Sequence, residues 1–162
     1  MTTIIAKEIR AKEILDEPKI LDEEMKMGAV RVPVKLTSAF EEGLVSRGSL
    51  HPKYLHIHEA IGLVDTGALT LVIPQTVAEY LGLKIDGTQV ARFANGATDV
   101  LGVTEPVKIE CQGRTVAVEA LVVGDEILIG QVVLELMDFL VDCNNQKLIP
   151  NPKNPDYPVA MI

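Results

Sequence analysis

From residue 28 onward the sequence is a succession of short apolar runs with a period of two, and this pattern constrains the fold most strongly. In residues 30–36, Val and Leu alternate with Arg, Pro and Lys. Such alternation is typical of a strand that buries one face, because successive side chains point to opposite sides of a sheet. Pro33 has no N–H to donate and therefore indicates an edge strand. The chain is expected to enter its folded part as a half-buried strand.

The rest of the chain alternates turn signals with further short apolar runs. Residues 37–53 are polar and contain Gly43, Gly48 and Pro52, which predicts a surface loop. Asn95-Gly96 predicts a hairpin turn, since both residues tolerate positive φ. From residue 28 onward, helical spacing occurs in two short stretches, residues 74–81 and 132–137. Strands are expected within residues 54–64, 69–73, 88–93, 97–103, 107–111, 115–123, 139–141 and 147–149. The sequence predicts an all-β domain, a closed barrel or folded β-sheet with one or two short helices.

Composition limits the class of protein. The 162 residues, 48% of them hydrophobic, suit one domain with a single core. A formal net charge of −8 argues against a nucleic-acid partner, because phosphates are held by clustered Lys and Arg. No apolar run approaches the roughly 20 residues of a membrane span, so no membrane partner is expected. Cys111 and Cys143 do not make a disulfide framework and favour a reducing, cytoplasmic location. No residue pattern indicates a cofactor.

Residues 1–27 differ from the rest of the chain. They are rich in charge, with apolar residues at loosely helical spacing and Pro18 to end a turn. We expect a short N-terminal extension, weakly helical or disordered, followed by one domain over residues 28–162. A helix that docks on a partner and a leader removed by the protein itself are alternatives that the composition leaves open.

The candidate for chemistry is the stretch Leu63-Val64-Asp65-Thr66-Gly67-Ala68. An Asp that leaves a buried strand and enters a glycine turn is held by nearby backbone groups, which is the placement that a catalytic acid needs. Gly67 lets the backbone approach a ligand or a second copy closely. The alternative is an ordinary β-turn that Thr66 and Gly67 complete.

In residues 28–152 the sequence resembles the retropepsin-like aspartic proteases, the single-lobed family of retroviral type, and within it a bacterial subgroup. Three elements carry the resemblance in the expected order: the Asp65 stretch, the hairpin around Asn95-Gly96, and Ile127-Leu128-Ile129-Gly130 ahead of a short helix. The resemblance implies that Asp65, Thr66 and Gly67 form the catalytic loop. It also implies that the hairpin covers substrate, so the expected substrate-binding residues are Ala68, Ala94, Asn95, Gly96 and Ala97.

The chain carries one Asp-Thr-Gly, whereas peptide hydrolysis by this family uses two carboxylates. The resemblance therefore implies a homodimer in which two copies of Asp65 meet on a two-fold axis and activate water against a peptide or protein substrate. Gln131 stands where many retropepsins carry Arg, which removes an ion pair that supports the dimer in retroviral enzymes. We expect the tail at residues 154–162 to pair between subunits. The alternative function is a non-catalytic retropepsin-like dimerisation or peptide-binding module.

Two other groups of residues, three histidines and three further aspartates, are considered as functional sites. His56 and His58 are two residues apart on an expected strand, with His51 nearby, which is the spacing of a metal site. Without added Cys or carboxylate ligands in the pattern, we expect no metal there. Asp99, Asp138 and Asp142 are the other Asp residues considered for a second catalytic carboxylate. None precedes Thr-Gly, and all three are expected in turns or on the surface.

Overall fold

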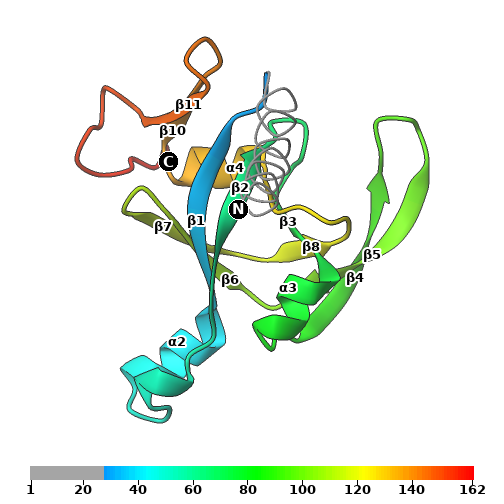
Figure 1. The fold of residues 1–162 in the computed structure, drawn as a ribbon, viewed down its shortest axis with the longest axis vertical. Coiled ribbons are helices and arrows are strands. Elements are labelled where there is room, and N and C mark those ends of the chain that lie inside the picture. The colour runs from blue at the N-terminus through cyan, green and yellow to red at the C-terminus, as the bar shows by residue number, and fades with distance from the viewer. Residues whose placement is uncertain (1–27) are drawn as a thin grey trace, which may run out of the picture.

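The computed structural model describes residues 28–162. The predicted extension over residues 1–27 lies outside the described residues, so the domain boundary at residue 28 stays a prediction. The described part is mostly β, as expected, with strands in a large sheet and a separate hairpin (Figure 1). The strands are β1 (Arg31–Ser38), β2 (Ile57–Val64), β3 (Leu71–Ile73), β4 (Ile85–Arg92), β5 (Thr98–Thr104), β6 (Val107–Cys111), β7 (Arg114–Val118), β8 (Ala120–Val122), β9 (Leu128–Ile129), β10 (Phe139–Asp142) and β11 (Lys147–Pro150).

The large sheet is open, which makes the prediction of a closed barrel wrong. Its nine strands run in the order β4-β5-β8-β3-β9-β2-β1-β6-β7, while β10 and β11 form the separate two-stranded sheet. Strands β4 and β7 are therefore edges and do not pair with each other. The run at residues 115–123 divides at Glu119, because β7 pairs with β6 whereas β8 pairs with β3 and β5. The sheet folds over the core without closing.

Strand β1 shows the predicted alternation, but it is not an edge strand. Val32, Val34 and Leu36 are buried, and β1 pairs along its length with β2. On its other side β6 pairs only from Lys35 onward. Pro33 therefore lies where the second neighbour is missing, and its lack of an N–H removes no hydrogen bond from the β6 ladder.

The described residues contain three short α-helices, more than the one or two expected. They are α2 (Ala39–Ser46), α3 (Gln75–Tyr80) and α4 (Gln131–Leu136), with a 3₁₀ turn at Pro52–Tyr54. Helices α3 and α4 match the predicted stretches. Helix α2 lies in the segment predicted as a loop, where the Ser38 hydroxyl accepts a hydrogen bond from the Glu41 N–H and so caps its first turn. In Figure 1 α2 projects from the end of the molecule opposite the β2–β3 loop.

One hydrophobic core joins the concave side of the sheet to α3, α4 and the β10–β11 hairpin. Its members come from β1, β3, β6, β8, β9, β10, β11, α3, α4 and the segments beside them, as expected for one domain. The fully or almost fully buried side chains include Leu36, Leu71, Ile73, Leu81, Val107, Ile109, Cys111, Ile129, Val133 and Met137. Strands β2, β3 and β9, which hold the Asp65 loop, rest directly on this core.

Candidate active site

Strand β9 lies between β2 and β3 and fixes where the Asp65 loop begins and ends. It runs parallel to β2, with Val64 paired to Ile129, and antiparallel to β3, with Leu71 paired to the same Ile129. The chain that leaves β2 must therefore pass over the end of β9 to reach β3. Residues 65–70 make this crossing, so the loop is supported from below by backbone that arrives 60 residues later.

Asp65 is the first residue of the crossing, and its backbone and side chain are both held. Its N–H donates to the Ile129 carbonyl at 3.0 Å, and its own carbonyl accepts the Ala68 N–H at 3.1 Å. Carboxylate oxygen Oδ1 accepts the Gly67 N–H at 2.9 Å. Asp65 is half-buried, while Thr66 and Gly67 are exposed. The result is a carboxylate fixed by backbone and open to solvent, which is the geometry required of a group that handles a proton on a bound molecule.

Gly130 follows β9 directly, at a position where a side chain does not fit. A Cβ at this position would lie 2.2 Å from the Thr70 carbonyl oxygen and 2.7 Å from the Ala68 carbonyl oxygen. The next two N–H groups, of Gln131 and Val132, donate to the carbonyls of Ala68 and Leu69, each at 2.9 Å. Helix α4 therefore begins against the loop, and both chain segments share the same hydrogen bonds.

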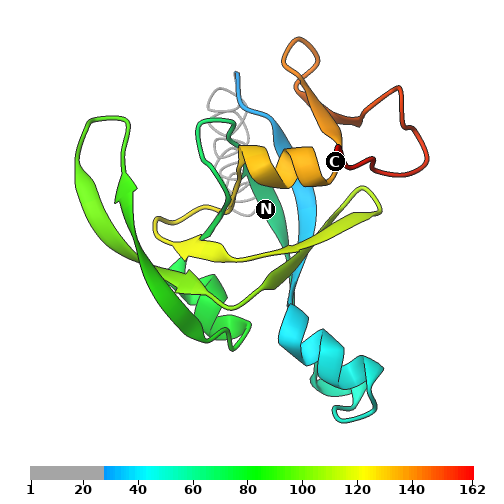
Figure 2. The same ribbon diagram turned by 180° about the vertical axis from the view of Figure 1, so that it is seen from behind.

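The predicted substrate-covering residues form the tip of the β4–β5 hairpin. Gly96 has φ +83°, and its N–H donates to the Phe93 carbonyl at 2.9 Å. The Asn95 side chain accepts the Ala97 N–H at 2.9 Å, so the turn is held by its own residues. The predicted residues Ala94–Ala97 are all exposed. In both views the hairpin tip and the β2–β3 loop lie at the same end of the molecule (Figures 1 and 2).

The three other Asp residues considered for a second catalytic carboxylate have partners of their own. Asp99 accepts the N–H of the next residue, Val100, at 2.8 Å. Asp138 accepts hydrogen bonds from the side-chain amides of Asn151 and Asn154, and these bonds hold its pKa below the usual value. Asp142 accepts from Asn145, whose side chain and N–H lower the pKa of Asp142. Asp138 and Asp142 thus serve turns near the C-terminus of the chain.

His56 and His58 both lie near the Tyr80 ring, whereas His51 lies near Tyr54. His51 accepts the Lys53 N–H, His56 pairs with Glu41 at 2.9 Å, and the ring of His58 lies 5.7 Å from that of Tyr80. Within residues 28–162 no group of three or more His, Cys, Asp or Glu side chains is placed to hold a metal ion.

Comparison with protein families gives a match, which covers the Asp65 loop. A family model described as "gag-polyprotein putative aspartyl protease" matches residues 57–136, just under half of the chain. The mostly β fold and this match support a retropepsin-like aspartic protease fold. The matched part runs from β2 through α4 and contains the Asp65 loop, Gly130 and the β4–β5 hairpin.

Two solved structures are also similar to this chain. One is the protease of simian foamy virus (mac), at 17% identity and a TM-score of 0.42, covering 64% of this chain and 90% of that one. The other is a foamy viral protease-reverse transcriptase in complex with an RNA/DNA hybrid, at 18% identity and a TM-score of 0.45. It is covered over 66% of this chain but only 12% of its own length. No curated protein sequence matches this chain.

Sequence reasoning missed a long-range contact that shapes the site. The Thr70 hydroxyl donates to the Glu119 carbonyl at 3.2 Å, which ties the end of the loop to the segment between β7 and β8. No local pattern marks this bond, since the two residues are 49 positions apart.

No helix among the described residues has the length and apolar content to traverse a lipid bilayer.

Proposed function

We propose that this chain is a homodimeric aspartic endopeptidase in which Asp65, Thr66 and Gly67 of two subunits form one catalytic centre. The observation that carries the proposal is the Asp65 carboxylate, fixed by the Gly67 N–H on a loop that β9 and Gly130 support, within the part of the chain that matches the aspartyl protease family. A single chain supplies one such carboxylate, and a second copy supplies the other.

In this mechanism the two Asp65 carboxylates share one proton. The ionised carboxylate removes a proton from a water molecule, whose oxygen attacks the scissile carbonyl carbon, while the protonated one donates to the carbonyl oxygen. Collapse of the tetrahedral intermediate breaks the C–N bond and expels the amine, which takes up the proton that the first carboxylate removed from water, while a hydroxyl of the intermediate returns its proton to the second carboxylate. Two close carboxylates cannot both ionise readily, so the pair titrates in two macroscopic steps. Activity should therefore be greatest in the pH range between those steps.

The surface around Asp65 supports a second copy as the partner. Leu69 on the loop is 66% exposed, and Leu136 on α4 and Leu140 on β10 are about half exposed. Exposed large apolar side chains such as these are suited to burial against a second copy. By the family resemblance, Thr66 bonds across to the partner's loop. Ala68 and the hairpin tip at residues 94–97 contact an extended peptide substrate.

The end of the chain offers a second place for contact between subunits. Arg114 donates to the carbonyls of Asn154 and Pro155, so the first part of the predicted pairing segment is held on its own chain. Val159 and Met161 beyond it are exposed. The Val159 N–H donates to Asp138 of its own chain, so the proposed inter-subunit pairing is confined to residues 160–162. Membership of a bacterial subgroup and a cytoplasmic location remain proposals that rest on the sequence.

A mixed peptide library tests the function directly. Wild type, Asp65→Asn and the matched control Asp156→Asn are incubated with the library at several pH values, and new termini are identified by mass spectrometry. Wild type and the control should cleave the same peptides, and Asp65→Asn should lose about 10²-fold or more in rate. Equal cleavage by Asp65→Asn would remove Asp65 from the mechanism.

The non-catalytic alternative predicts a different result from the same samples. A dimerisation or peptide-binding module would retain library peptides without cutting them, in wild type and Asp65→Asn alike. Sizing by light scattering on these samples separates the two parts of the proposal, since an active monomer would exclude the shared pair of carboxylates.

A further inference from the structure

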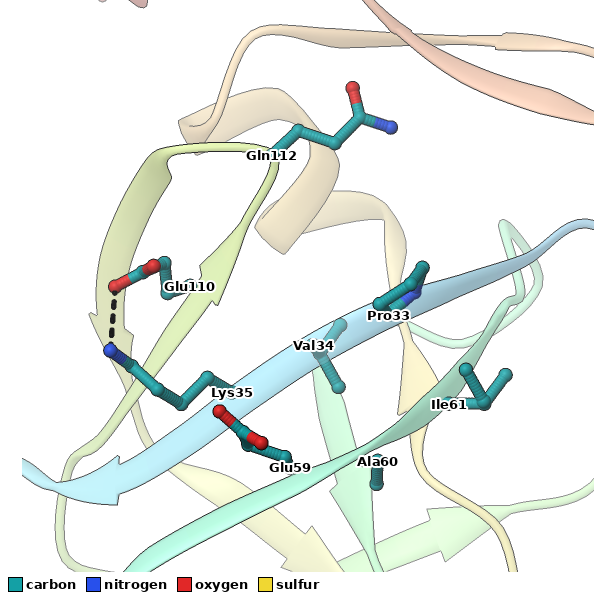
Figure 3. A pocket seen from close by; sticks show the side chains of 8 residues that line it. All are labelled: Pro33, Val34, Lys35, Glu59, Ala60, Ile61, Glu110 and Gln112. Atoms are coloured by element: carbon teal, nitrogen blue, oxygen red, sulfur yellow. Dashed lines mark ion pairs between the residues drawn. The ribbon is translucent and has the colours of Figure 1, made fainter.

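A groove lies on the outer face of the sheet, across β1, β2 and β6, away from the Asp65 loop. Its volume is about 600 Å³, which is within the range of ligand sites in proteins. Figure 3 shows the side chains that line it, with apolar groups at one end and charged groups at the other. The apolar end is formed by Pro33 and Ile61, which are directly paired across β1 and β2.

The charged end carries an excess of negative charge. In the strand register Lys35 lies opposite Glu59 on β2 and opposite Glu110 on β6, so two acidic residues flank one basic residue. The Lys35 Nζ is 3.2 Å from Glu110 Oε2 (Figure 3). Both of these side chains are more than a third exposed, so this ion pair is weak and open to competition. One carboxylate remains without full compensation, which favours a cationic group in the groove.

The apolar end lacks cover in the described chain. Ile61 is 56% exposed, in a strand where its neighbour Gly62 is buried. An occupant that fits the whole groove therefore combines branched apolar side chains with basic ones, a few residues apart in sequence.

A segment of this chain has that composition. Residues 4–12 read Ile-Ile-Ala-Lys-Glu-Ile-Arg-Ala-Lys, with three basic residues and one acidic residue. They precede the described part of the chain, which begins at Gly28. Residues 13–24 are predominantly acidic and would be repelled by Glu59 and Glu110, so the basic half is the part that suits the groove.

The connection is long enough for this contact. Lys35 lies about 23 Å along the strand from Gly28, since a strand rises about 3.3 Å per residue. The 15 residues between Lys12 and Gly28 span up to about 50 Å when extended. Gly28 has φ +86°, a conformation that glycine adopts readily, so a change of chain direction is available just before β1.

We propose that residues 4–12 bind in the groove across β1, β2 and β6 of their own chain. Ile5 and Ile9 contact the apolar end at Pro33 and Ile61, and Lys7, Arg10 and Lys12 face the carboxylates of Glu59 and Glu110. This contact covers the exposed apolar surface and fixes the start of the chain on the outer face of the sheet. It is independent of the proposed protease activity.

Zero-length carbodiimide coupling of the full-length chain tests the proposal. The reagent joins ammonium and carboxylate groups that are in contact, and an equal mixture of ¹⁵N-labelled and unlabelled chains shows whether a coupled pair comes from one molecule. Lys7 and Lys12 should couple to Glu59 or Glu110 within a single chain. Coupling between labelled and unlabelled chains would overturn the proposal, since a second copy would then supply the segment.

Two matched variants leave every reactive group in place. Ile61→Ser removes the apolar contact and should lower the yield of these cross-links about fivefold or more. Val100→Ser, at a residue 62% exposed on the β4–β5 hairpin, should leave the yield unchanged. Circular dichroism establishes that both variants are folded. An unchanged yield in Ile61→Ser, or cross-links spread evenly over exposed carboxylates such as Glu79 and Glu119, would show that the segment does not bind here.

Discussion

At the scale of single residues, Gly130 is the position where a side chain is least compatible with the structure. A Cβ there would meet the carbonyl oxygens of Thr70 and Ala68 at 2.2 and 2.7 Å. These are backbone atoms that cannot move without displacing the Asp65 loop. Gly130→Ala is therefore expected to lower the free energy of unfolding by more than about 2 kcal/mol.

Urea denaturation measures this loss, with Gly87→Ala as the control. A Cβ at Gly87 would have no heavy atom within 4 Å, so the control should change stability by less than about 0.5 kcal/mol. Equal stability of the two variants would mean that the loop and α4 can separate at no cost.

The two cysteines should differ sharply in reactivity. Cys111 is buried in the core, and burial raises the pKa of its thiol to about 11. Cys143 is exposed in the turn between β10 and β11. Since the thiolate is the species that alkylates, iodoacetamide at about pH 8 should modify Cys143 and leave Cys111 unmodified in the folded protein. Peptide mapping checks the outcome, and modification of Cys111 without denaturant would contradict its placement in the core.

The sequence predicted Asp65 better than it predicted what holds Asp65. A carboxylate between a buried strand and a glycine turn is a local pattern, and it is visible within six residues. The support from Ile129 and Gly130 depends on β9 lying between β2 and β3, a pairing of residues about 60 positions apart. Sequence periodicity predicts that a strand exists, but it contains no information about which strand lies beside it.

At the scale of elements, the last part of the chain is held by a polar network around Asp138 and Arg114. Arg114 is buried, and it donates to four backbone carbonyls, those of Met137, Asp138, Asn154 and Pro155. Asp138 accepts from Asn151, Asn154 and the Val159 N–H. Because Met137 is the C-cap residue of α4, the network ties the C-terminal segment to the helix that begins at the Asp65 loop.

This network should make stability depend on pH. The pKa of Asp138 lies below its usual value, mainly because of the hydrogen bond from the Asn151 amide and, next in size, the one from the Asn154 amide. A carboxyl with a lowered folded-state pKa adds stability above its unfolded pKa of about 3.9, and loses it as the pH falls through the folded value. Asp138→Asn should therefore lower Tm most at neutral pH, with a gap from wild type that narrows below about pH 4. Thermal melts at several pH values measure the gap, and a gap that is constant with pH would assign its cause to packing instead.

Helix α2 shows what element-level prediction can miss when a signal is present. Residues 37–53 were predicted as a loop because Gly43, Gly48 and Pro52 dominate their appearance. Ser38 followed by Glu41 is nevertheless the pattern of a capping box, and the Ser38 hydroxyl does accept the Glu41 N–H at 3.2 Å. The capping residues were the better guide to this helix than the glycines.

At the scale of the whole molecule, the large sheet is open and ends in two edge strands. Edge strands β4 and β7 both remain without a second neighbour in the described part of the chain. A closed barrel would have removed both edges, but closure depends on the pairing of the first and last strands, which a list of strands does not determine. The all-β class was therefore predictable, and the open order of the nine strands was not.

The proposed catalytic centre belongs to two molecules, and mixing two kinds of molecule tests this directly. Wild type is held at one concentration while Asp65→Asn is added in tenfold excess, with time allowed for subunits to exchange. If each centre needs two Asp65 carboxylates, most wild-type chains then have an inactive partner, and cleavage should fall about tenfold. The same excess of Asp65→Asn carrying Leu69→Asp and Leu136→Asp, which places charges on the proposed apolar interface, should inhibit far less. Cleavage that is unaffected by the Asp65→Asn chain, in samples where native mass spectrometry of ¹⁵N-labelled wild type and unlabelled variant shows mixed dimers, would mean that one Asp65 carboxylate is sufficient for the reaction.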